Sequence, residues 1–474
     1  MQRQYAYKNP VVEVSYKVSE FKAGFGRVNT TPMMGVEIDG YFEDRFAEGV
    51  LDELEANAVA FSCGGQPQVF VCIDLCAVLP DLADSMRKLV AKELKLDVRS
   101  IHISATHSHT SPAALETTED PLIAQYTAFL KRRVVDVAAA AIEDLKPSAL
   151  GWGVGVAPGI TFKRRFRMKD GSTRTNPGVN NPDIEAPIGD VDERVGVLRI
   201  DQENGKHIVV VNYANHADTI SGCKVSADWP GYARRMVEKA LDNTRCVYFN
   251  GAEGDVNHVN VWPGRNRIPG YDYANVRHMG SVVAGAVMQV YHKMTYINVD
   301  DICCADTVVH VPSNRGDPKD LPEARRIRNL FIEGRKDEIP YTGMMLITKV
   351  KEAARMIQLE NGPDYFDLPM SAIRLGNVAL VTLPGEAFTD IGVALKEAEG
   401  WDTVLVLGET DGCAGYFPVT QAYIEGGYEA QGSRYKQGVS ELLINAGLEL
   451  LKETKQVGKE VHARKNHLNR PDVN

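Results

Sequence analysis

The stretch Ile101-His102-Ile103-Ser104-Ala105-Thr106-His107-Ser108-His109-Thr110-Ser111-Pro112 is the starting point for predicting the fold. Its first half has the apolar pattern of a buried strand, and its second half carries two histidines. Side chains two residues apart in a strand share a face, so His107 and His109 are expected to continue the inward face of Ile101 and Ile103. A metal ion, or a bound group that needs a proton, would offset the cost of burying two imidazoles. Alternatively, as is common for an isolated His-x-His pair, one of the two histidines is a structural residue of the core or of a turn and binds no ligand.

The composition is that of a soluble globular protein. Of the 474 residues, 44% are hydrophobic and 24% are charged, and the formal net charge is -10. This acidic balance disfavours nucleic acid as a partner and electrostatic docking on an anionic membrane. No apolar run reaches the ~20 residues of a membrane helix, and the N-terminus lacks the apolar segment of a signal peptide. The eight cysteines form no dense framework, so a reduced, cytoplasmic protein is expected.

Apolar runs alternate with helical patterns along most of the chain. This order predicts an α/β fold with a mixed, largely parallel central sheet flanked by helices and an active site at the strand carboxyl ends. Strands are expected at residues 68–74, 196–200, 207–213, 246–250, 306–311, 377–383 and 403–407, and a strand broken by glycines at 21–32. Helices are expected at about residues 81–94, 121–145, 274–293, 387–399 and 438–454.

The chain is expected to form one catalytic domain over residues 21–455, between an N-terminal arm (1–20) and a polar C-terminal tail (456–474). Within it, residues 151–192 are rich in glycine, proline, asparagine and arginine, which predicts a long irregular insertion. Such a segment is either a lid or binding loop, or an ordinary surface insertion. Residues 315–362 are charged and have a helical pattern, which predicts a helical insertion over the sheet.

Polar residues follow five of the predicted strands at their carboxyl ends. They are Asp74; His107 and His109; His216; Asp255, Asn257 and His258; and Glu386. In open α/β sheets, ligands bind in the crevice outside the carboxyl ends of the strands, so these side chains are expected to converge. Two histidines and a glutamate with a vacant position are a typical catalytic zinc set, whereas structural zinc sites typically use cysteine. Each residue alone could also serve as a cap or turn residue.

The same residues carry a resemblance to a known family. Thr106-His107-Ser108-His109-Thr110-Ser111-Pro112 resembles the T-H-T-H-S-G-P motif of the neutral/alkaline non-lysosomal ceramidases. The further matching motifs are Asn215-His216 with Asp228-x-Pro230-Gly231-Tyr232; Asn250-Gly251-x-x-Gly254-Asp255-Val256; Leu383-Pro384-Gly385-Glu386; and Tyr416, Tyr423 and Tyr428 at the family's Y-x₆-Y-x₄-Y spacing. The motifs occur in the family's order across residues 21–430. Their shared order makes the set more specific than any single motif.

The resemblance implies a zinc-dependent amidase with one zinc ion per chain. The implied metal ligands are His107, His216, Glu386 and Tyr416. The residues implied to bind or polarise the amide are His109, Arg164 (or Arg165, since the loop alignment is loose) and Tyr428, with Asn257 at the position of an active-site serine. The remaining substrate-binding candidates are Asp74, Arg165, Asp255 and His258. Zinc lowers the pKa of a bound water and polarises a carbonyl, and donors nearby stabilise the oxyanion.

Departures from the family pattern shift the expected substrate away from ceramide. Asn257 replaces the serine of the family's G-D-V-S-P-N motif, and neither a C-terminal immunoglobulin-like domain nor a secretory signal is visible in the sequence. A small N-acyl or other amide substrate is therefore expected, without nucleic acid or membrane insertion, and a homo-oligomer is left open. Two alternatives remain: a metal-dependent esterase or lactonase, and a metal-binding homologue without turnover. Other divalent ions than zinc also suit histidine and carboxylate ligands.

Overall fold

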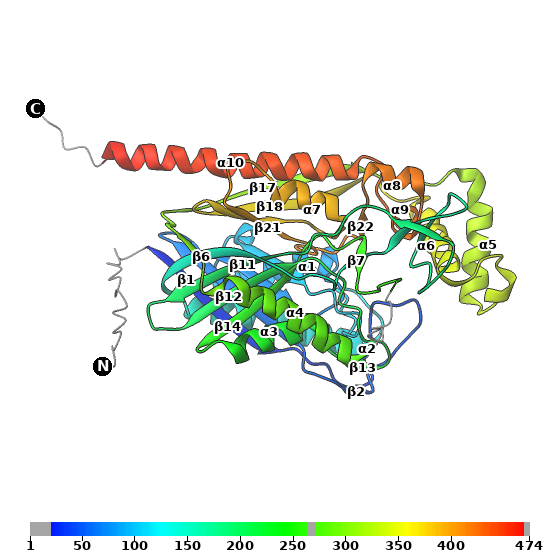
Figure 1. The fold of residues 1–474 in the computed structure, drawn as a ribbon, viewed down its shortest axis with the longest axis horizontal. Helices are drawn as coiled ribbons and strands as arrows, with labels where there is room; N and C mark the ends of the chain where they lie inside the picture. Colours follow the sequence, from blue (N-terminus) through cyan, green and yellow to red (C-terminus); the bar gives the residue numbers. More distant parts are fainter. Residues whose placement is uncertain (1–19, 263–271, 469–474) are drawn as a thin grey trace, which may run out of the picture.

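The computed structural model describes residues 20–262 and 272–468, with the backbone alone for 457–468. Its largest element is a nine-stranded sheet (Figure 1). The strands are β1 (Phe21–Asn29), β3 (Glu55–Cys63), β4 (Gln68–Ile73), β5 (Ile101–Ala105), β6 (Lys146–Val156), β11 (Arg194–Gln202), β12 (His207–Tyr213), β14 (Thr244–Asn250) and β16 (Thr295–Ile297). Their order is β14-β12-β11-β6-β1-β3-β4-β5, and β16 pairs with β6.

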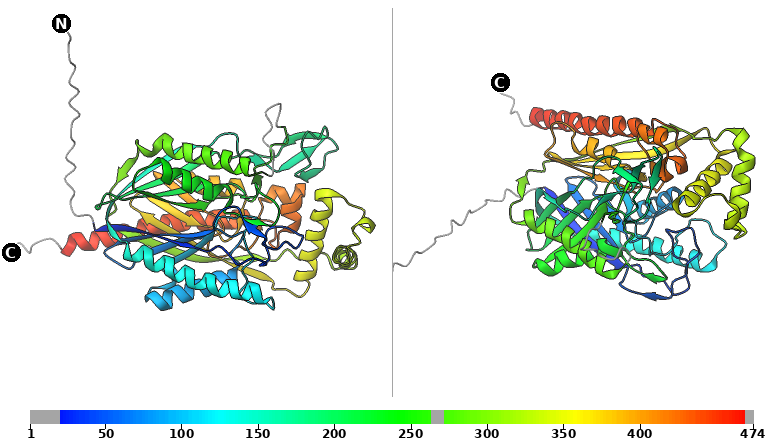
Figure 2. Two further views of the ribbon diagram at one scale, coloured as in Figure 1. Left: turned by 90° about the horizontal axis from the view of Figure 1, so that it is seen from below. Right: turned by 45° about the vertical axis from the view of Figure 1, so that its right-hand side comes forward.

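The sheet consists of two halves that meet at a short corner. There, β1 and β6 share only the pairs Lys22–Pro147 and Ala23–Lys146. The helices that cover the halves are α1 (Pro80–Leu94), α2 (Pro121–Glu143), α3 (Asp228–Ala240) and α4 (Tyr273–Tyr291). The half with β3, β4 and β5 packs on α1 and α2, and the half with β11, β12 and β14 packs on α3 and α4. The two helix pairs lie on opposite sides of the molecule (Figure 2, left).

A second sheet completes the core. It contains β17 (Ile302–Pro312), β18 (Tyr365–Leu375), β19 (Val378–Thr382) and β21 (Thr403–Leu407), and it is backed by α7 (Thr389–Lys396) and α10 (Val439–Leu468). The inner faces of both halves and of this sheet meet in one central cluster, to which Phe70, Val210 and Leu405 belong. Both faces of the inner strands are therefore buried, which explains their nearly continuous apolar runs.

The main sheet is mixed and flanked by helices, as predicted, but it is less parallel than expected. Its parallel pairs are β4–β5 and β12–β14, and its other pairs are antiparallel. The reason is connection length. Residues 64–67 and 203–206 join β3 to β4 and β11 to β12 as hairpins, whereas a parallel connection needs about a dozen residues or more. The segments that contain α1 and α3 supply such connections for the parallel pairs β4–β5 and β12–β14.

The glycines of β1 do not break the strand, contrary to the sequence prediction. β1 pairs with β3 along its whole length. A Cβ at Gly24 would lie 2.1 Å from Ala141 O, and one at Gly26 would lie 2.3 Å from Val137 O. These glycines therefore allow the backbone of α2 to approach the strand.

Residues 151–192, for which a long irregular insertion was predicted, divide into a part of the main sheet and a part outside it. Residues 151–156 continue β6 within the main sheet, where a Cβ at Gly155 would lie 2.2 Å from Ala286 O of α4. The strands β8 (Arg165–Met168), β9 (Thr173–Thr175) and β10 (Ile184–Pro187) then form a small antiparallel sheet. Gly155 thus reflects close packing of a strand on a helix, whereas the glycines from Gly159 to Gly189 have positive φ.

Residues 315–362 contain the expected helices, α5 (Leu321–Ile332) and α6 (Gly343–Leu359), at the end of the molecule away from the end of α10 (Figure 1). The helix α10 continues to Leu468, past its predicted end at about residue 454 and through much of the predicted polar tail. Residues 1–19 and 469–474 of the predicted arm and tail lie outside the described residues. Within the described part of the chain, no helix combines the length and apolar character needed to cross a membrane.

Candidate functional site

The segments that follow β5, β12 and β21 are joined by backbone hydrogen bonds. His109 N donates to Ala217 O at 2.9 Å, and Asp411 N donates to Ile103 O at 2.7 Å. The segment after β19 joins them, because Leu383 N donates to Leu407 O at 2.8 Å. These bonds bring strand ends from both halves of the main sheet and from the second sheet to one place.

His107, His216 and Glu386 lie at this meeting point. One ring nitrogen of each histidine and one carboxylate oxygen of Glu386 lie within 4.8 Å of one another. Glu386 Oε2 is 3.7 Å from His107 Nε2 and 3.5 Å from His216 Nε2. All three residues are buried, and Glu386 Oε2 has no hydrogen-bond partner among the described residues. Two imidazoles and an unpartnered carboxylate oxygen fit a divalent metal ion such as zinc.

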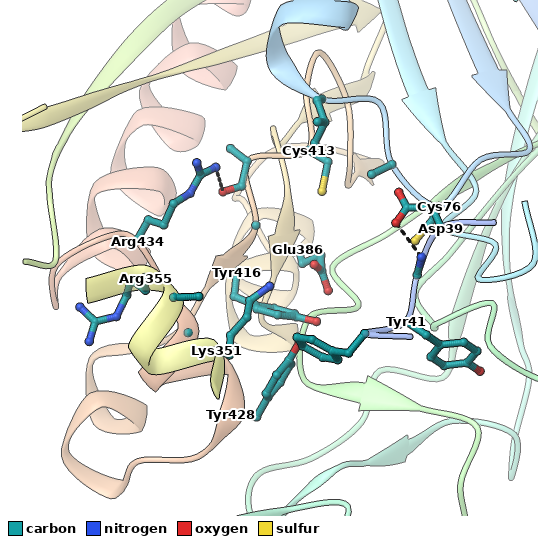
Figure 3. Close-up of a pocket in the computed structure, with 18 of the residues that line it drawn as sticks. Asp39, Tyr41, Cys76, Lys351, Arg355, Glu386, Cys413, Tyr416, Tyr428 and Arg434 are labelled. Carbon is teal, nitrogen blue, oxygen red and sulfur yellow. Dashed lines mark hydrogen bonds between the residues drawn. The ribbon is translucent and has the colours of Figure 1, made fainter. Parts of the chain in front are cut away.

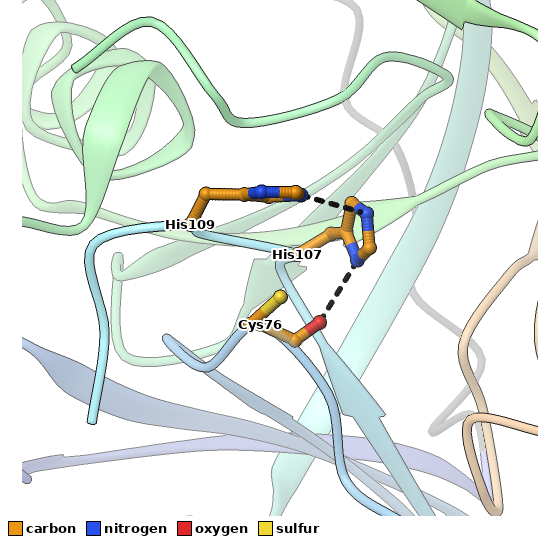
Figure 4. A group of neighbouring side chains, drawn as sticks. All are labelled: Cys76, His107 and His109. Carbon is orange, nitrogen blue, oxygen red and sulfur yellow. Dashed lines mark hydrogen bonds between the residues drawn. The ribbon is translucent and has the colours of Figure 1, made fainter. Parts of the chain in front are cut away.

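His107 reaches this point by leaving the strand. β5 ends at Ala105, and His107 has a left-handed backbone with φ of 66°. Strand alternation therefore does not explain its direction, and that part of the sequence argument is wrong. His107 and His109 nevertheless face each other, with their Nε2 atoms 3.2 Å apart, and Cys76 O lies 2.8 Å from His107 Nδ1 (Figure 4).

Tyr416 lies beside this triad on a neighbouring short strand. The strands β20 (Glu386–Ala387) and β22 (Tyr416–Phe417) are parallel, with Glu386 opposite Tyr416. The Tyr416 ring centroid is 5.7 Å from that of Tyr428. Burial, and then the Glu386 carboxylate, raise the pKa of the Tyr416 phenol. The hydroxyl is thus neutral at ordinary pH unless a cation binds to it.

Two further buried glutamates lie close to His107. Glu409 Oε1 is 3.3 Å from His107 Nδ1 and accepts a hydrogen bond from Cys413 Sγ. Glu253 has an oxygen within 4.8 Å of ligand atoms of His107 and Glu409, and neither of its oxygens has a hydrogen-bond partner among the described residues. Burial alone would lower the pKa of His107, but the carboxylates of Glu409 and Glu386 raise it to about 10.

The sequence analysis missed both of these glutamates. Glu409 follows β21 closely, so the strand-end signal that singled out Glu386 was available for it as well. Glu253 lies inside the Asn250–Val256 motif, at a position that the motif leaves open.

Of the two candidate loop arginines, Arg164 contacts the triad. Its Nη1 is 3.1 Å from His216 Nε2, its Nη2 donates to Gly254 O at 2.6 Å, and its Nε is 2.7 Å from Glu429 Oε1. Arg165 instead forms an ion pair with Glu425 at 3.1 Å. Neither arginine lines the cavity next to the triad. Metal binding at His216 Nε2 would replace the contact with Arg164.

Asp74 and Asp255 form buried ion pairs outside the cavity. The Asp74 oxygens accept hydrogen bonds from both terminal nitrogens of Arg234, at 2.9 and 2.6 Å. Asp255 Oδ2 is 2.6 Å from Lys163 Nζ, and its other oxygen accepts a hydrogen bond from Thr389 N. These carboxylates thus join distant segments of the fold.

Asn257 and His258 are buried near the triad but also outside the cavity wall. Asn257 Nδ2 donates to Asn176 Oδ1 at 2.9 Å, and Asn257 Oδ1 accepts a hydrogen bond from Val259 N. His258 is close enough to His216 for its charge to contribute to the lowered pKa of that histidine, after burial and Arg164. The structure therefore places both residues in a layer behind the cavity wall.

A cavity of about 420 Å³ opens beside the triad (Figure 3). The predicted site residues in its wall are His107, His109, Glu386, Tyr416 and Tyr428. Further wall residues, which the sequence analysis did not identify, are Asp39, Tyr41, Cys76, Lys351, Arg355, Cys413 and Arg434. They come from loops and from α6, and no strand-end pattern or motif marks most of them.

No protein-family model and no curated protein matches this chain. Its structure is similar to neutral ceramidase from Pseudomonas aeruginosa, with a TM-score of 0.70 and 16% identity over 91% of this chain and 74% of that chain. It is also similar to a ceramidase complexed with C2, with a TM-score of 0.69 and 16% identity over 91% and 75% of the two chains. The fold implied by the sequence motifs is thereby confirmed. This chain has the α/β fold of the neutral ceramidases.

Proposed function

We propose that this protein is a zinc-dependent amidohydrolase that cleaves the C–N bond of a small N-acyl or other amide substrate. The observation that carries the proposal is the convergence of His107, His216 and Glu386, of which His107 and Glu386 line a cavity of about 420 Å³. The likeness in fold to proteins named ceramidases supports the same class of reaction. Tyr416, next to Glu386 on the paired strand, is the proposed fourth ligand.

A zinc ion held by these residues would polarise the amide carbonyl and lower the pKa of a water molecule. His109 lines the cavity with its Nε2 3.2 Å from His107 Nε2, where it can accept the proton of the attacking water and pass it to the leaving nitrogen. Burial raises the pKa of the Tyr428 phenol, which therefore stays protonated and can donate a hydrogen bond to the oxyanion. Arg164 would give up its contact with His216 Nε2 to the metal. It is still held by Gly254 O and lies 5.2 Å from the ring centroid of Tyr416, so its proposed role is to position Tyr416.

The proposed setting is the cytoplasm. No disulfide joins any two of the eight cysteines, all of which the structure describes, and Cys76 and Cys413 lie in the cavity wall. Free thiols at these positions support a reducing compartment.

Metal content tests the site directly. Elemental analysis of protein purified without added metal should give about one zinc per chain for the wild type. His107→Ala and Glu386→Ala should both lose the metal, whereas His292→Ala, an exposed histidine at the end of α4, should retain it. Absence of zinc from the wild type, or its retention in both site variants, would overturn the proposal.

A substrate panel then separates the possible reactions. The wild type and His107→Ala are each assayed for hydrolysis of four kinds of compound: N-acyl amides, p-nitrophenyl esters, p-nitrophenyl phosphate and a long-chain ceramide. Amide hydrolysis that His107→Ala abolishes supports the proposed function. Hydrolysis of esters alone would assign an esterase, and bound metal without any turnover would assign an inactive metal-binding homologue.

A further inference from the structure

One side of the cavity carries three cationic side chains. Lys351 and Arg355 lie on α6, and Arg434 follows the short helix α9 (Tyr428–Gly432). Residues four apart share a helix face, so Lys351 and Arg355 reach the same wall. The three lie together on one side of Glu386, and Asp39 lies on the other side (Figure 3).

These cations are not neutralised by nearby carboxylates. Within the part of the chain that the structure describes, no carboxylate oxygen lies within 4.0 Å of their nitrogens. Arg355 donates to the carbonyl oxygens of Gln431 and Asn314, and Arg434 donates to Ala414 O at 3.0 Å. Their charge therefore remains available to an anion in the cavity.

Arg355 adds a buried positive charge to this wall, because it is only 8% exposed. Burying a guanidinium without an anion is costly. Burial lowers the pKa of Arg355, and the partial offset from Glu352 does not restore it. Figure 3 shows its guanidinium directed away from Glu386, so Arg355 adds positive charge to this side of the cavity without a direct contact at the catalytic end.

Lys351 is placed close to the proposed catalytic end of the cavity. A Cβ at position 432 would lie 2.7 Å from Lys351 Cγ, so Gly432 leaves room for the lysine stem. Lys351 Nζ lies 5.9 Å from the ring centroid of Phe42. Figure 3 shows the amino end of Lys351 directed toward Tyr416. Burial raises the pKa of the Tyr428 phenol, and Lys351 is close enough for its charge to offset part of this rise, so the ammonium group lies near Tyr416 and Tyr428.

We propose that the substrate is an amide that carries an anionic group, and that Lys351, assisted by Arg355 and Arg434, binds this group. The inference rests on the proposed amidohydrolase function and names the substrate class of that site. A carboxylate and a phosphate both accept charge-assisted hydrogen bonds from ammonium and guanidinium groups. An N-acyl amino acid is the simplest such amide, since its carboxylate lies close to the scissile bond.

Three amides with one acyl group test this specificity: N-decanoylglycine, the neutral N-decanoylglycinamide, and N-decanoylphosphoethanolamine. The wild type should hydrolyse at least one anionic amide with kcat/KM about tenfold or more above the neutral one. The better of the two anionic amides identifies carboxylate or phosphate as the recognised group. Equal or faster hydrolysis of the neutral amide would overturn the inference and leave the amidohydrolase function intact.

The variant Lys351→Met keeps the aliphatic stem and removes the charge. It should reduce the anionic-to-neutral ratio of kcat/KM by about 10- to 100-fold, as expected for hydrogen bonds to charged groups. Lys349→Met is the matched control, because Lys349 lies on the same helix, pairs with Glu352 and does not line the cavity. An unchanged ratio in Lys351→Met would contradict the assignment.

Binding separates the two proposals if none of the amides is hydrolysed. Isothermal titration of the wild type and Lys351→Met with N-decanoylglycine and N-decanoylglycinamide then reports on the cavity alone. Tighter binding of the acid, weakened about tenfold by Lys351→Met, would support the anion site without the reaction. Equal binding of the two compounds, or no effect of the variant, would reject the anion site as well.

Discussion

At the scale of single residues, the candidate site depends on contacts behind the metal-facing atoms. His107 directs Nε2 to Glu386, while its Nδ1 faces Cys76 O and Glu409. Its left-handed backbone is a conformation that costs about 1–3 kcal/mol for a residue with a side chain. Such a ligand needs partners that hold its ring in place.

Glu409→Gln is therefore expected to weaken zinc binding by about 10- to 100-fold, because outer partners orient metal-ligating histidines. Competition with a chromophoric zinc chelator measures this change. Glu397→Gln is the control, since the Glu397 side chain is 63% exposed and pairs with Arg194 at the surface. Unchanged zinc affinity in Glu409→Gln would show that Cys76 O alone orients the ring.

Asp74 illustrates a strand-end carboxylate that serves the fold. Asp74→Asn is expected to lower the free energy of unfolding by about 3–5 kcal/mol, because it leaves the buried Arg234 without its main anionic partner. Urea unfolding gives the value, and Asp97→Asn, in an exposed pair with Arg99, should change it by about 1 kcal/mol or less. A loss of substrate affinity without a loss of stability would instead support the substrate-binding role predicted from the sequence.

At the scale of elements, close backbone approach fixes where the ligands lie. Gly254 N donates to Ala387 O at 2.8 Å, which places the Gly254–Val256 segment against β20. A Cβ at Gly254 would lie 2.4 Å from Glu386 O. The strand that carries Glu386 therefore depends on a glycine at this position.

Gly254→Ala is expected to displace β20 and so to lower both zinc occupancy and the melting temperature. Gly285→Ala is the matched control, because a Cβ there meets no atom within 4 Å and the residue lies inside α4. The control should be more stable than the wild type by about 0.5–1 kcal/mol. Elemental analysis and calorimetry of both variants measure the two effects, and full zinc occupancy in Gly254→Ala would contradict the argument.

The sequence predicts an element well when the pattern that indicates it lies within the element and its immediate neighbours. His207–Tyr213 and Thr403–Leu407 are strands with the predicted bounds, because each is an apolar run that ends in polar or glycine residues. Strand pairing and glycine contacts are not local. The reason for a glycine at position 155 is its contact with Ala286 in α4. The sequence alone does not show this contact, so the glycines there predict irregular structure.

The same distinction applies to the site. His107, His216 and Glu386 were found because strand ends and motifs mark them, but Asp74 follows a strand in the same way. Asp74 differs from the triad residues because it is paired with Arg234, which lies 160 residues away in sequence. Lys351 was missed because its helical insertion reaches the cavity through packing of α6 on α9, which no pattern in the insertion indicates.

At the scale of the whole molecule, the triad joins three parts of the fold. His107 follows β5 in one half of the main sheet, His216 follows β12 in the other half, and Glu386 follows β19 in the second sheet. Each part has its own helices on its outer face, and the three share one core. A metal ion at the triad would therefore link all three at the end of the molecule where their strands end.

Zinc is accordingly expected to stabilise the whole chain. A ligand that binds only the folded protein adds about 2.7 kcal/mol at a free concentration one hundred times its Kd. Protein stripped of metal by a chelator should unfold at a lower temperature, and added zinc should restore the higher value in a concentration-dependent way. His216→Ala should show a much smaller rise, because the site then lacks one of its four proposed ligands and no longer joins the half of the sheet that carries β12. A rise of equal size in wild type and His216→Ala would show that the stabilising ion does not depend on His216 and would place it elsewhere.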